Sequence, residues 1–230
     1  RPQLTVPDVP RDRVICFALY TVHDKILKLT AQLAPLDEPS AVVSLETKDE
    51  SGEWRSMATA PVDPLARTAT FRLADWDDSR DVPYRVVVSP GGERHQWSGT
   101  VRPDPKDKPE IVVAAFTGNN DLGFPNNDIY ESIRYNDPDF LFFSGDQIYE
   151  GVGSFGVQRE PVDKSTLDYL RKWYLYGWAY GDLMRDRPTV AIPDDHDVFQ
   201  GNLWGWEGRQ SGRTAFKHTR TRFLSIIPHL

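Results

Sequence analysis

Alternation of apolar and polar residues is the clearest pattern in the first hundred residues. It is most regular over 26–33, where the apolar positions are Leu27, Leu29, Ala31 and Leu33 and the polar positions between them are Lys28, Thr30 and Gln32. Because successive side chains of a strand point to opposite faces, this period of two predicts a half-buried strand.

The same pattern recurs at short intervals before residue 103. Further strands are predicted over 14–20, 41–47, 69–73, 84–88 and 96–101, with turn-forming residues such as Ser51-Gly52 between them. Regularly spaced short strands are typical of an antiparallel β-sandwich. We therefore expect an immunoglobulin- or fibronectin-like β-sandwich over residues 1–103.

A polar, proline-rich segment over 104–109 interrupts this pattern and predicts a linker. Beyond it, nearly continuous apolar runs at 111–116 and 140–143 predict central strands covered on both faces. Helices are predicted over 128–135, 165–178 and 212–224, with a short strand over 189–192. Strands that alternate with helices predict an α/β domain over 110–230.

Composition supports packed cores and excludes some classes of partner. Apolar residues make up 39% of the 230 residues and charged residues 27%, a balance typical of globular proteins. Aromatic residues over 173–180 are expected to pack in the core and on the surface rather than to form a substrate platform. The net charge of -7 argues against a nucleic-acid partner, whose recognition needs clustered Lys and Arg.

Neither a membrane span nor a disulfide is expected. The sequence contains no run of ~18 apolar residues, and its first residues lack the layout of a signal peptide. Cys16 is the single cysteine, so no intrachain disulfide can form and cysteine usage favours no compartment. A soluble, already processed chain is expected.

Three polar clusters each follow an apolar strand of the second half, over 117–121, 144–150 and 193–197. Ligands of parallel α/β sheets bind at the carboxyl ends of the strands, so these clusters are expected to converge on one site.

The second cluster carries the strongest candidate ligands. Gly145 permits a sharp turn at the strand end, after which Asp146 can direct a carboxylate toward cations. Tyr149 follows three residues later, about one helical turn, so its phenol can face the same point.

The third cluster places Asp194, Asp195, His196 and Asp197 in succession, with Asn202 beyond them. Such a density of like charge is costly unless cations or hydrogen bonds offset it. At least one of these carboxylates is expected to bind a ligand or to orient one. His196 could ligate a metal, donate a proton or contact phosphate.

These motifs resemble those of a known enzyme family. The segments 145–150 (GDQIYE) and 194–198 (DDHDV), with Asn202 beyond, are similar to the two central motifs of alkaline phosphatase D-like enzymes of the calcineurin-like metallophosphoesterase superfamily. The segments 84–88 and 97–103 resemble the end of the N-terminal β-sandwich of that family.

The resemblance implies a secreted or periplasmic hydrolase of phosphate mono- or diesters. Its metal centre would hold Fe³⁺ and Ca²⁺ in a pair or larger cluster, with Zn²⁺ or Mn²⁺ as alternatives. Asp146 would bridge the ions, Tyr149 would bind iron and Asn202 the second metal, while His196 and Asp195 would orient the substrate or relay a proton. Asn119 or Asp121 stands near the place of the family's usual cysteine ligand.

The resemblance also implies that 110–230 is the N-terminal half of a two-sheet catalytic domain flanked by helices. Either the histidines of the second half then come from a segment beyond Leu230, or the metal site is incomplete.

Two other classes of function compete with the phosphatase. One is a non-catalytic protein with a degenerate metallophosphatase domain, binding metal or, through its tryptophans, carbohydrate. The other is a glycosidase that uses paired carboxylates of the acidic cluster. Iron and calcium content separates the enzyme from the binding protein, and carbohydrate turnover that is insensitive to chelator would indicate the glycosidase.

Overall fold

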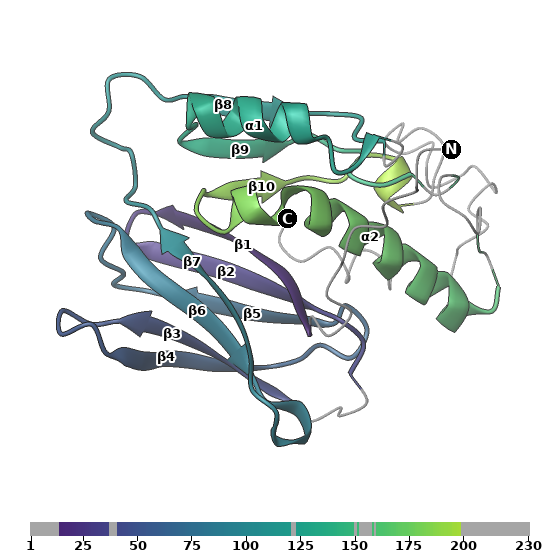
Figure 1. Cartoon of the computed structure of the whole chain (residues 1–230), viewed down its shortest axis with the longest axis horizontal. Helices are drawn as coiled ribbons and strands as arrows, with labels where there is room; N and C mark the ends of the chain where they lie inside the picture. Colours follow the sequence, from purple (N-terminus) through teal and green to yellow (C-terminus); the bar gives the residue numbers. More distant parts are fainter. Residues whose placement is uncertain are drawn as a thin grey trace, which may run out of the picture.

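A computed structural model describes residues 14–36, 41–120, 123–149, 151, 158 and 160–198. Its strands form three sheets, of which two are antiparallel and one is parallel (Figure 1). Asn202, Asp121 and the helix predicted over 212–224 lie outside the described residues.

The two antiparallel sheets form the predicted β-sandwich. The first contains β1 (Ile15–His23), β2 (Ile26–Leu33) and β5 (Thr68–Leu73), in the order β1-β2-β5. The second contains β3 (Val42–Lys48), β4 (Trp54–Pro61), β6 (Val82–Val88) and β7 (His95–Val101), in the order β4-β3-β6-β7. Each of the six predicted strands is present, so the expected antiparallel sandwich is confirmed.

Strand β4 was not predicted from the sequence. It lies at the edge of its sheet, and most of its side chains are exposed, including the large apolar side chain of Met57. An edge strand with little buried surface has no need for alternating apolar residues. Its place in the fold is set by pairing with β3 instead.

The prediction that β2 is half-buried is wrong. Leu27, Leu29 and Leu33 are buried as expected, but Thr30 and Gln32 on the opposite face are also buried. The helix α2 (Val162–Met184) supplies a polar partner there, because Trp173 Nε1 donates a hydrogen bond of 3.0 Å to Gln32 Oε1. The side-chain amide of Gln32 also donates to the carbonyl oxygen of Ala66. These bonds let a polar side chain be buried at small cost.

The second half of the described chain contains a three-stranded parallel sheet. Its strands are β8 (Val113–Phe116), β9 (Phe140–Phe143) and β10 (Thr189–Ala191), in the order β10-β9-β8. Helix α1 (Asn127–Asn136) connects β8 to β9, and α2 lies between β9 and β10 in sequence. The structure thus confirms strands that alternate with helices, as well as the positions of the two helices.

The expectation that β8 is a central strand covered on both faces is wrong. Among the described strands it pairs with β9 alone, and Val113 is 49% exposed. The central position belongs to β9, whose Leu141 and Phe143 are fully buried. A run of apolar residues identifies a strand, but it does not show whether other strands pair with it along one edge or along both.

Helix α2 joins the parallel sheet to the sandwich. In Figure 1 the two antiparallel sheets lie below α2, and β8 and β9 lie above it. The ring of Tyr176 contacts Phe143 of β9 at 5.1 Å between centroids and Phe17 of β1 at 6.3 Å. Trp173, Tyr176 and Tyr180 are buried, which confirms their expected packing role. The buried side chains form one cluster on both sides of the predicted linker 104–109.

No helix in the described ranges is long and apolar enough to cross a membrane, in agreement with the sequence.

The close approach of α2 to β1 at Gly177 allows this packing to be tested. A Cβ atom at Gly177 would overlap the aromatic ring of Phe17. Gly177→Ala should therefore lower the free energy of unfolding by about 1–3 kcal/mol, although alanine is the better helix former. Urea unfolding measures the loss. In the double variant with Phe17→Leu, the loss should be smaller than the sum of the two single losses; additive effects would contradict the overlap.

Candidate metal centre

The loops that follow β8, β9 and β10 meet at one edge of the parallel sheet. The backbone N–H of Asn119, after β8, donates to the carbonyl oxygen of Asp146, after β9, at 2.9 Å. The carboxylate of Asp197, after β10, accepts hydrogen bonds from the backbone of the β9 loop. Parallel strands end at a common edge, so the three polar clusters of the sequence come together there.

Gly145 and Asp146 turn the chain sharply at the end of β9. Their φ angles are +117° and +55°, both in the left-handed region that side chains rarely adopt. A Cβ atom at Gly145 would overlap the Cβ atom of Asp194 and lie 3.0 Å from its backbone nitrogen. Glycine is therefore required by both the backbone angle and the close approach of the β10 loop.

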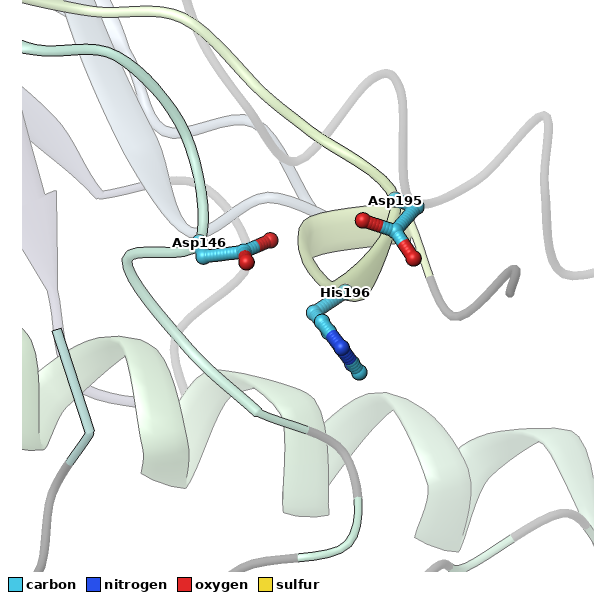
Figure 2. A group of neighbouring side chains, drawn as sticks. All are labelled: Asp146, Asp195 and His196. Atoms are coloured by element: carbon cyan, nitrogen blue, oxygen red, sulfur yellow. The ribbon is translucent and has the colours of Figure 1, made fainter. Parts of the chain in front are cut away.

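Asp146, Asp195 and His196 form a group of side chains that could hold a metal ion. One ligand atom from each lies within 4.8 Å of the others, and all three residues are partly buried. Figure 2 shows Asp146 on the loop after β9, facing the short helix η3 (His196–Val198), which begins at His196 and follows Asp195 directly. Two carboxylates and an imidazole are a donor set that suits iron, manganese or zinc.

The surroundings of Asp146 disfavour an isolated negative charge. Its Oδ2 accepts a hydrogen bond of 3.1 Å from the Tyr149 hydroxyl, whereas its buried Oδ1 accepts none from the described residues. Burial raises the pKa of Asp146, and the nearby carboxylates of Asp195 and Asp194 raise it further. A buried carboxylate oxygen without a donor is costly, and a bound cation would remove that cost. The site therefore fits a metal ion.

Tyr149 lies against the same group. Its ring is 4.5 Å from the His196 ring between centroids, and its hydroxyl faces Asp146. Burial and the negative charge of Asp146 raise the pKa of Tyr149 to about 12. The phenol is therefore protonated at neutral pH unless a cation beside it favours the phenolate.

Asp197 is nearly inaccessible to solvent, and sequence reasoning did not separate its role from those of its acidic neighbours. It is 1% exposed, and its two oxygens accept hydrogen bonds from four backbone N–H groups. Burial raises the pKa of Asp197 to about 7, although these bonds favour the charged form. One indication of a separate role was present in the sequence: the cluster 194–197 holds more carboxylates than a single metal ion needs as ligands.

The backbone N–H of Asn119 bonds to Asp146 of the group, but the side chain of Asn119 points to α2. Its Oδ1 accepts a hydrogen bond of 3.1 Å from the Tyr180 hydroxyl, and its buried Nδ2 has no acceptor among the described residues. A ligand role for Asn119 remains a prediction, as do the roles of Asn202 and Asp121.

Neither a protein-family model nor a curated protein matches the chain. The functional argument therefore rests on the residues of the site and on the motifs that contain them.

The turn at Gly145 leads to a prediction with a matched control. Gly145→Ala should lower the free energy of unfolding by roughly 2–5 kcal/mol, since left-handed strain of about 1–2 kcal/mol adds to the overlap with Asp194. Gly52→Ala introduces strain at a φ of +84°, where a Cβ atom meets nothing within 4 Å. The loss of unfolding free energy in Gly52→Ala should therefore be confined to the left-handed strain of about 1–2 kcal/mol. Equal losses in urea unfolding of the two variants would contradict the close approach of the loops.

Proposed function

We propose that the chain carries the metal site of a phosphate-ester hydrolase of the alkaline phosphatase D type. The observation that supports this most is the group of Asp146, Asp195 and His196, whose ligand atoms lie within 4.8 Å of one another on two loops. The same residues belong to the two motifs that resemble that family. The resemblance adds iron and calcium as the proposed ions and phosphate mono- or diesters as the substrates.

The proposed ligands are Asp146, Asp195 and His196, joined by Tyr149. Bound cations would withdraw charge from the phosphoryl group and lower the pKa of water. Asp146 has a buried Oδ1 available for this role. Tyr149 would have to lose the proton that it now donates to Asp146, so metal binding should release a proton.

Asp195 and His196 combine two proposed roles. Their place within the group supports metal ligation, whereas the family resemblance implies that they orient substrate or transfer a proton. His196 is only partly buried, so its side chain is not sealed from solvent. An imidazole that holds a proton can donate it to a leaving oxygen.

A metal-binding protein without hydrolase activity is the second candidate. It is favoured by Asn119, whose side-chain oxygen is held by Tyr180 of α2. The described loop after β8 thus offers the group a backbone contact but no carboxylate or thiolate.

Metal binding is expected to stabilise the protein. At a free Mn²⁺, Fe or Ca²⁺ concentration of 100 times Kd, binding adds about 2.7 kcal/mol, which corresponds to a rise in Tm of roughly 5–10 °C. Chelator should reverse the rise. Asp146→Asn should abolish it, whereas Glu50→Gln, which removes one charge from an exposed turn, should retain it. Calorimetry and elemental analysis measure both effects, and a Tm that is independent of metal would contradict the site.

Hydrolysis is tested with aryl phosphate mono- and diesters in the presence of iron and calcium. The full-length protein should release product, and Asp195→Asn should lower kcat/KM on the order of a hundredfold or more because an anionic group at the reacting centre is lost. Glu50→Gln again serves as the control. Metal binding without turnover would support the second candidate instead, and carbohydrate turnover in chelator would indicate a glycosidase.

A further inference from the structure

All acceptor positions of the Asp197 carboxylate are occupied by backbone N–H groups. Oδ1 accepts from Gln147 at 2.9 Å and from Ile148 at 3.2 Å. Oδ2 accepts from Asp146 at 2.7 Å and from Asp194 at 3.0 Å. A carboxylate has about four lone-pair sites, so none remains for a metal ion. Although it lies among the candidate ligands, Asp197 is therefore not one of them.

Three of the four hydrogen bonds connect two separate loops, and the fourth lies within the loop after β10. Three donors belong to the loop after β9, and the fourth, Asp194, belongs to the loop after β10. These donors are next to the candidate ligands in sequence, since Asp146 is itself a donor and Asp194 precedes Asp195. Movement of either loop would break hydrogen bonds to a buried charge, each worth about 1.5–3 kcal/mol.

The connection also explains how the strained turn after β9 persists. Asp146 has a left-handed backbone, with a φ of +55°. In that conformation its N–H, together with the next two along the chain, points at one acceptor carboxylate. Strained backbone persists where its surroundings over-determine it, and the Asp197 carboxylate supplies that constraint.

We propose that Asp197 is a positioning residue that joins the two loops and sets the distance between Asp146 and the pair Asp195 and His196. It would thus control metal affinity without touching an ion. The inference rests on the proposed metal site. Its structural half, the joining of the loops, can be measured in metal-free protein.

Hydrogen exchange of the unaltered, metal-free chain gives the first test. The amides of Asp146, Gln147, Ile148 and Asp194 should exchange slowly and with similar protection, because one carboxylate holds all four. The amide of Asp195 is an internal control, since it bonds to the exposed carboxylate of Asp194 and should exchange at least tenfold faster. Unprotected amides at the four positions would overturn the proposal without any variant.

Asp197→Asn gives the second test. Asparagine keeps the shape but turns two acceptor sites into donors that face N–H groups, so exchange at the four amides should accelerate at least tenfold. Mn²⁺ affinity, measured by the electron paramagnetic resonance of the free ion, should fall about 10- to 100-fold, as for other residues that orient ligands.

Asp78→Asn is the matched control. Asp78 is also buried and accepts a backbone N–H, that of Lys25, but it lies in the sandwich, where it also pairs with Lys106. Its loss should reduce stability without changing exchange at the four amides or Mn²⁺ affinity.

The outcomes separate the two proposals. If the unaltered chain binds Mn²⁺ and Asp197→Asn binds it equally well, the positioning role is wrong and the metal site stands. If the unaltered chain binds no Mn²⁺, the proposed metal site is wrong, and the role of Asp197 in metal affinity is wrong with it. Equal losses of affinity in Asp197→Asn and Asp78→Asn would reduce the effect to general stability and would also overturn the positioning role.

Discussion

The packing of α2 against β1 is the constraint on which the rest of the structure depends. Gly177 lets the helix approach so closely that a single Cβ atom would overlap Phe17, and Tyr176 beside it contacts both Phe17 and Phe143. Through this contact the parallel sheet shares one buried cluster with the sandwich. A three-stranded sheet with one exposed edge strand offers little core of its own, so the sandwich contributes the surface against which it is stabilised.

The site at the carboxyl ends of the parallel strands depends on a second constraint, which is electrostatic. Four carboxylates of two loops gather within a small volume, and they are accommodated in different ways. Asp197 is buried and satisfied by four N–H groups, whereas Asp146 is left with a buried oxygen that no described residue satisfies. One charge is thus compensated by the protein itself, and the other is suited to compensation by a cation. This difference supports a division between residues that shape the site and residues that bind metal.

The candidate site was only partly predictable from the sequence. Asp146, Tyr149, Asp195 and His196 were identified because each follows an apolar strand, and strand ends of a parallel sheet share one edge. The side-chain direction of Asn119, toward Tyr180, depends on where α2 passes and carries no local signal. The role of Asp197 was equally hidden, because the three carboxylates of 194–197 look alike in the sequence until the loop that supplies three of the N–H donors, some fifty positions earlier in the chain, is placed beside them.

The sequence by itself determined where the described α-helices and all described strands except β4 lie, and which half of the chain is antiparallel, because periods of two and of 3.6 residues are local properties. Only the tertiary structure decided that Thr30 and Gln32 are buried, that β8 pairs with β9 alone among the described strands, and that β4 exists. Each of these depends on another element of the fold: α2 covers β2, β9 is the one described strand that pairs with β8, and β3 pairs with β4. Burial depends on how elements pack against one another, so the residue pattern within one element cannot predict it.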